Sequence, residues 1–118
     1  TGSELAELST LDRKLGTATR TRRVTDIERL EFEFHRAVNL IAEARKLAWF
    51  LRTATLYTPA RFLSSDPGWR AAMRTDHEAL LAALRDGDAV GARASMSRHF
   101  TDGADRLVKH LDDLGLWS

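Results

Sequence analysis

Apolar residues recur every third or fourth position along most of the chain. This spacing is typical of amphipathic helices, which place such residues on one face. No stretch alternates strictly between apolar and polar residues, and none gathers β-branched residues between turn signals, so the sequence predicts no strand. The predicted fold class is therefore all-α, with about five to six helices.

The first two helices are predicted from their apolar stripes and their capping residues. A first helix covers about residues 3–18, with Ser3 as its N-cap. Its apolar stripe consists of Leu5, Leu8, Leu11 and Leu15. A second helix is expected to start near Asp26, because Thr25 and Glu28 match a capping box. It continues through Ile41.

Proline and glycine delimit the next two helices. Leu47, Phe50, Leu51 and Leu56 suggest a third helix that ends before Pro59. Asp66 followed by Pro67 predicts the start of a fourth, which runs to a stop at Asp86 and Gly87.

Asp88 is expected to cap a last helix that reaches about Asp113. Gly115 would end it and leave Leu116 and Trp117 to pack as a tail.

Composition limits the classes of function. With 118 residues and 43% hydrophobic content, residues 1–118 are expected to form a single domain. The formal charge of +1 provides no large single-sign field for binding nucleic acid. Cysteine is absent, so imidazole and carboxylate groups are the available metal ligands. No apolar run approaches a membrane span, and a cytoplasmic protein is expected.

A glutamate and three histidines form the candidate chemical site. Glu31 and His35 lie four residues apart on the second predicted helix, so their side chains share one face. His77 and His99 lie midway along separate predicted helices. Burying three imidazoles is costly unless something satisfies them, and a divalent cation would do so. Ser95 and Gly103, one turn from His99, would leave room for an ion and a ligand.

Other interpretations of these residues remain open. A single histidine on an apolar face is more often a hydrogen-bonded core residue than a metal ligand. The chain could thus be a purely structural dimerisation module, or a metal-dependent enzyme that uses the same four residues. The enzyme is not expected, because further acids or bases at motif spacing are lacking. Glu33 and Asp76 are interpreted as exposed charges.

Two sequence blocks carry a resemblance to a known family. The first is Glu31-Phe32-Glu33-Phe34-His35, and the second runs from Asp76-His77-Glu78 through Gly87-Asp88 to His99-Phe100. The chain resembles the effector-binding C-terminal domain of the FadR subfamily of GntR transcription regulators. The first block has glutamate where that family usually has aspartate. Ala42-Glu43-Ala44 replaces the family's usual small-Gly-Asn turn, which suggests a more helical junction there.

The resemblance implies both an architecture and a site. It implies an antiparallel helical bundle in which Glu31, His35, His77 and His99 bind zinc, nickel or a similar ion. A small organic acid would complete the coordination. A planar guanidinium matches a carboxylate, so Arg52 on the third predicted helix is the candidate for binding the acid's other end, with a solvated surface arginine as the alternative. A homodimer is expected. DNA would be bound only through an N-terminal winged helix-turn-helix, which has no counterpart among these residues.

Overall fold

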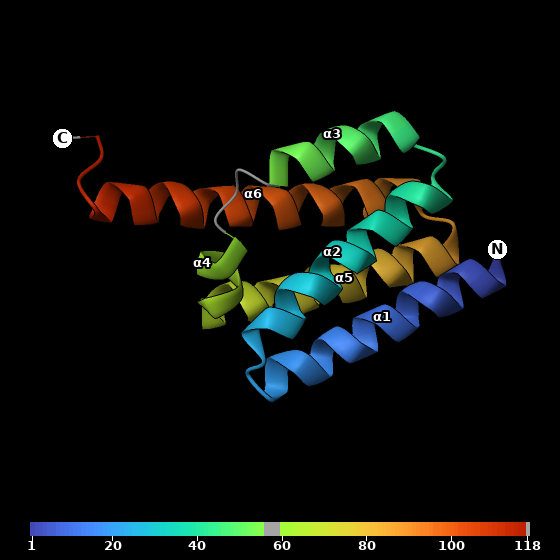
Figure 1. The fold of residues 1–118 in the computed structure, drawn as a ribbon. Helices are drawn as coiled ribbons and strands as arrows, with labels where there is room; N and C mark the ends of the chain where they lie inside the picture. Colours follow the sequence, from blue (N-terminus) through green and yellow to red (C-terminus); the bar gives the residue numbers. More distant parts are fainter. Residues whose placement is uncertain (56–59, 118) are drawn as a thin grey trace. The chain divides into compact units, whose positions relative to one another are not determined.

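The computed structural model describes residues 1–55 and 60–117. For residues 45–48, 55 and 60 it describes the backbone but not the environment of the side chain. In this part of the chain all regular secondary structure is helical, which confirms the all-α prediction. The helices are α1 (Gly2–Arg20), α2 (Val24–Ile41), α3 (Arg45–Thr55), α4 (Ala60–Ser65), α5 (Pro67–Asp86) and α6 (Ala89–Asp113) (Figure 1). They group into two compact units, Thr1–Ser64 and Ser65–Ser118. The single-domain organisation stays a prediction.

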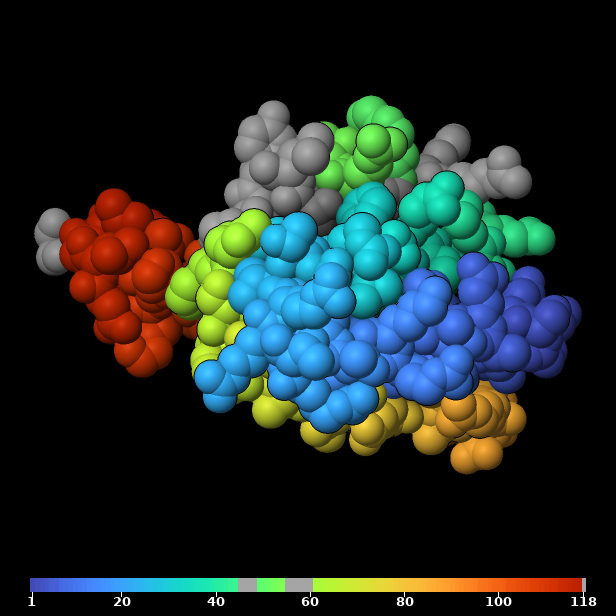
Figure 2. Space-filling model, turned by 60° about the horizontal axis from the view of Figure 1, so that its bottom comes forward, coloured from blue at the N-terminus to red at the C-terminus, as the bar shows by residue number. Residues whose placement is uncertain are grey.

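In the first unit, α1 packs along α2, and α3 packs against α2. The surfaces of α1 and of the beginning of α2 adjoin in the space-filling view (Figure 2). Both helices bury the stripe that carries their apolar residues. The buried apolar residues are Leu8, Leu15 and Ala18 on α1, and Ile27, Leu30, Phe34 and Ala37 on α2. Their spacing of three, four or seven residues within each helix keeps them on one side of it.

The predicted caps of the first two helices are wrong. Thr1, not Ser3, caps α1 and forms a capping box with Glu4. The second helix begins at Val24 without a side-chain cap, because the chain turns tightly after α1. In that turn the backbone N–H of Arg23 donates to the carbonyl of Ala18 at 3.0 Å. The helix therefore starts before the Thr25 box can form.

The connections after α2 also differ from expectation. A non-helical turn connects α2 to α3, and in it Glu43 has φ +55°. The expectation of a more helical junction is therefore wrong. Leu56 and Pro59 lie outside the described residues. The short helix α4, which was not predicted, is tied to α2 because Arg61 Nε donates to Glu28 Oε1 at 2.7 Å.

The second unit is a hairpin of α5 and α6, and its boundaries confirm the predictions. Asp66 caps α5 by accepting from the Gly68 N–H at 2.8 Å, and Pro67 takes the first helical position. Gly87 ends α5 in the left-handed conformation. Asp88 then caps α6 by accepting a hydrogen bond from Gly91 N–H at 2.9 Å. This tight connection sends α6 back along α5.

The two helices of the hairpin bury different kinds of side chain. The buried apolar residues of α5 are Trp69, Met73, Leu80, Leu81 and Ala83. On α6 the buried positions are Ser95, His99 and Gly103, four residues apart. Leu116 and Trp117 are 61% and 64% exposed, so the predicted packing of the tail is not found in this chain.

We expect Gly87→Ala to destabilise the chain by about 1 kcal/mol, because a Cβ is strained at positive φ. Gly87 has φ +68°, and an added Cβ would meet nothing within 4 Å, so backbone strain alone produces the loss. Urea unfolding measures it. Gly2→Ala is the matched control, because Gly2 also has open space but no positive φ. Equal stability of the two variants would contradict this account of the turn.

Candidate functional site

His77 lies in the interior on α5. It is 1% exposed, and both of its ring nitrogens are buried. Met73 and Leu81, one turn before and after it, are buried as well. As the sequence predicted, an imidazole is thus held in an apolar environment, where its polar atoms need compensation.

His99 on α6 faces His77. The centroids of the two rings are 4.9 Å apart, and their planes meet at 66°. His99 is 6% exposed, and its ring lies 6.1 Å from that of Trp69. Its neighbours one turn away, Ser95 and Gly103, are small and buried. The second unit therefore brings two predicted metal ligands together, with the indole ring of Trp69 near His99.

Glu31 and His35 form the corresponding pair on α2. His35 Nε2 and Glu31 Oε1 are 2.9 Å apart, as expected for residues one helical turn apart. Their side chains are only 18% and 16% exposed. Because an ionised carboxylate can only accept, the imidazole donates in this hydrogen bond. The first unit thus supplies a carboxylate and an imidazole, both groups that bind metal ions.

Arg52, the candidate effector-binding residue, is exposed on α3. Trp49 and Phe50, on the same helix, are 62% and 64% exposed. Nothing in the structure tests the proposed role of Arg52 in effector binding.

The sequence predicted Asp76 to be an exposed charge, and this prediction is wrong. Asp76 is 8% exposed, and Arg98 Nε on α6 donates to its Oδ1 at 3.3 Å. The expectation failed because the neighbouring helix covers this position and supplies a counter-ion. Glu33 is partly exposed and accepts from Arg29 at 2.9 Å, as a charge near the helix surface would.

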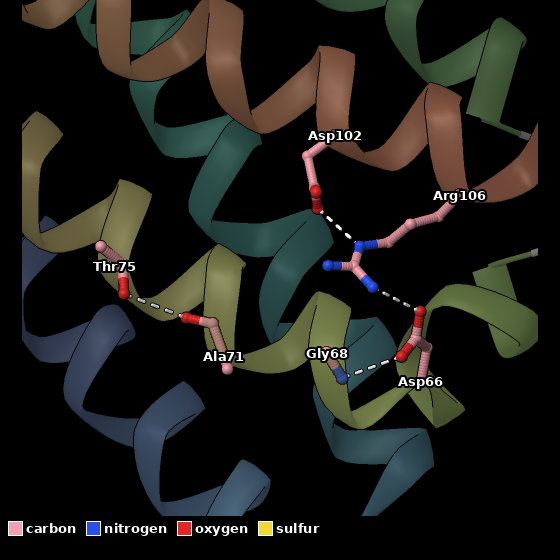
Figure 3. A network of polar contacts seen from close by, with 6 residues as sticks. All are labelled: Asp66, Gly68, Ala71, Thr75, Asp102 and Arg106. Carbon is pink, nitrogen blue, oxygen red and sulfur yellow. Dashed lines mark hydrogen bonds and ion pairs between the residues drawn. The ribbon is translucent and has the colours of Figure 1, made fainter.

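A second polar network joins the start of α5 to α6 (Figure 3). Arg106 Nη1 donates to Asp66 Oδ2 at 3.1 Å, and its Nε donates to Asp102 Oδ2 at 2.9 Å. A Cβ at Gly68 would lie 2.6 Å from Arg106 Nη1, so the guanidinium would have to shift if alanine stood there. Sequence reasoning identified the Asp66 cap but missed Arg106. The only local signal is its spacing of four residues from Asp102.

This network also changes the acidity of Asp66. Burial raises the pKa of Asp66, but hydrogen bonds from Arg106 and from the backbone of Gly68 and Trp69 outweigh it and lower the pKa. The ionised carboxylate therefore stabilises the start of α5, which carries Trp69 against His99.

Comparison with known families identifies the class of protein. A family model described as the FCD domain matches residues 1–102. The chain belongs to the FCD domain family. The FCD domain is the C-terminal effector-binding domain of FadR/GntR-type transcription regulators, as the resemblance implied. It is a regulatory ligand-binding domain and not typically catalytic. FCD domains often bind metal.

Neither the comparison with curated proteins nor that with solved structures gave a match. Within residues 1–55 and 60–117, no helix has the length and apolar character needed to cross a membrane.

We expect Asp66→Asn to lower the free energy of unfolding by about 1 kcal/mol at neutral pH, because asparagine keeps the cap but loses the charge that faces Arg106. The folded-state pKa of Asp66 lies below its ordinary value of 3.8. Its contribution is therefore complete above that value and is lost as the pH falls through the folded-state pKa. Urea unfolding should show a gap between parent and variant at pH 7 that closes in acid. A gap independent of pH would contradict this role of the charge.

Proposed function

We propose that this FCD domain senses a small organic acid through one divalent metal ion held by Glu31, His35, His77 and His99. The observation that carries the proposal is the buried pair of His77 and His99, whose rings face each other at 4.9 Å. The pair of Glu31 and His35 in the other unit supplies the remaining donors. That these two pairs share one ion is the central step of the proposal.

The donor set fits a transition metal. Three imidazoles and one carboxylate suit zinc, nickel, cobalt or iron(II), and the first two are the proposed ions. An ion bound by both His35 Nε2 and Glu31 Oε1 would take the place of the hydrogen bond that now joins these two atoms, with the imidazole proton on Nδ1. Glutamate is one methylene longer than the aspartate usual in the family, and the side chain's flexibility can accommodate that difference.

If the coordination number of the ion is greater than four, the four protein ligands leave a position open for the effector. A carboxylate is a suitable ligand there, because zinc in proteins binds carboxylate oxygens as well as imidazole nitrogens. The planar guanidinium of Arg52 would bind the other end of the acid, since its geometry matches a carboxylate.

Effector binding would act by shifting the population of conformations. The shift is limited by the difference in the effector's affinity for the two states. In the full regulator, we propose that this bias passes through a homodimer to DNA-binding modules outside this domain.

The metal proposal predicts about one ion per chain after purification without chelator. His77→Ala and His99→Ala should each abolish stoichiometric binding, whereas His110→Ala, outside the proposed ligand set, should retain it. Elemental analysis with native mass spectrometry measures the ratio. At a free-metal concentration about a hundredfold above the Kd, the bound ion should stabilise the parent by about 3 kcal/mol relative to the metal-free protein. Chelator should remove this stabilisation.

A parent protein that holds no stoichiometric ion, and melts at the same temperature with and without chelator, would support the structural-module interpretation instead. Turnover of a hydrolysable substrate by the metal-loaded chain would support the enzyme.

The effector proposal predicts that Arg52→Ala weakens binding of small dicarboxylic acids by about tenfold or more, because a charged hydrogen bond is lost. Nickel affinity should not change, since Arg52 is not a proposed ligand. Calorimetry with the metal-loaded chain measures both quantities. Arg36→Ala, which removes an exposed arginine from α2, serves as the control. Equal acid affinity in the parent and Arg52→Ala would exclude the assigned role.

A further inference from the structure

Two pairs of residues connect α5 and α6 side by side. Asp76 directly precedes His77 on α5, and Arg98 directly precedes His99 on α6. The two imidazole rings face each other, and the two preceding residues form an ion pair at 3.3 Å. Consecutive residues in an α-helix are separated by about 100° around its axis. Each helix therefore carries a histidine and, at this angle to it, a charged residue that pairs with the other helix.

The ion pair joins a buried carboxylate to an accessible guanidinium. The Asp76 side chain is 11% exposed, whereas that of Arg98 is 57% exposed. Arg98 Nη2 also donates to Ser95 Oγ at 3.3 Å. Ser95 is buried on α6 and donates to the carbonyl of Gly91 at 2.9 Å. One planar guanidinium thus spans a carboxylate of α5 and a hydroxyl fixed to the backbone of α6.

This arrangement restricts how the helices can rotate. Ser95 and Gly103 are small residues, so the buried face of α6 has few large side chains that could interlock with α5 and stop α6 from turning about its axis. A rotation that moved His99 away from His77 would also move Arg98 away from Asp76. Such a movement would leave a buried carboxylate without its counter-ion, which is strongly unfavourable.

We propose that Asp76 and Arg98 are positioning residues, which keep His77 and His99 facing each other for metal binding. This inference rests on the proposed metal site, but the facing of the rings can be tested without metal. The pair does not need to contact the ion. It acts through the rotational setting of the two helices, in the way that residues around a metal site orient its ligands.

A double-mutant cycle with nickel tests the proposal. Asp76→Asn and Arg98→Gln should each weaken nickel affinity about tenfold, the lower end of the effects seen when residues behind metal ligands are changed. The double variant should also lose about tenfold rather than about a hundredfold, because both changes remove the same interaction. Arg93→Gln is the matched control, since Arg93 is an exposed arginine on the same helix. Competition with a chromophoric chelator measures the affinities.

Stability and affinity must be measured separately. A lower melting temperature with unchanged nickel affinity would overturn the proposal, because it would show a purely structural ion pair. Additive losses in the double variant would overturn it too. If Asp76→Asn does not fold, Arg98→Lys provides the test at an exposed position. It keeps the charge but loses the planar fork, and should weaken nickel binding about threefold, whereas unchanged affinity would contradict the proposal.

A metal-free measurement separates this inference from the proposed function. Nuclear Overhauser effects between the rings of His77 and His99 should be present in the chelator-treated parent and in Arg93→Gln. They should be weakened or lost in Asp76→Asn and Arg98→Gln. If the parent binds no nickel, the proposed function fails, while these ring contacts still decide the positioning role. Unchanged ring contacts in both variants would overturn it.

Discussion

The buried contact between His77 and His99 is the interaction on which the proposed function depends. Two imidazoles in the interior are expensive, since each brings polar nitrogens into an apolar environment. A leucine at position 77 or 99 could be buried without this desolvation cost. On α6 the other buried positions, Ser95 and Gly103, are also not large apolar residues. This helix face is therefore poorly designed for hydrophobic packing and well designed to hold a polar group.

Specific polar contacts join α5 and α6 where the hydrophobic packing of α6 is weak. Gly87 sets the turn at one end, and the contact of Arg106 with Asp66 joins the helices at the other. Asp76 and Arg98 connect them in between. Each contact uses directional geometry, which sets register and rotation in a way that apolar burial alone does not. The two histidines thus lie between the polar contact at one end of the hairpin and the turn at the other, next to the ion pair of Asp76 and Arg98.

Much of the fold could be predicted from local signals. The all-α class followed from the apolar period, and the bounds of α5 followed from an aspartate cap, a proline and a glycine. The start of α2 could not be predicted, because the tight turn through Arg23 competes with the Thr25 box. That competition depends on how α1 ends, which a capping pattern does not describe. The short helix α4 has no apolar period long enough to reveal it.

The candidate site shows the same division. Spacing predicted that Glu31 and His35 would meet, because one helix fixes both. The facing of His77 and His99 requires two helices in register, and family resemblance, not spacing, indicated it. The prediction that Asp76 is exposed was wrong because its partner, Arg98, lies on the next helix and is not evident from the residues beside Asp76. Long-range pairs of this kind are determined by packing, which a single sequence does not display.

X-ray absorption spectroscopy of the nickel-loaded chain tests most directly whether all four side chains share one ion. The account predicts a first shell of nitrogen and oxygen atoms with the scattering of about three imidazole rings, because three histidines are proposed as ligands. The scattering should fall to about two rings in His35→Ala, since the remaining pair stays on the hairpin. A spectrum with two or fewer rings in the parent, unchanged by His35→Ala, would show that the pair on α2 binds no shared ion and would contradict the account.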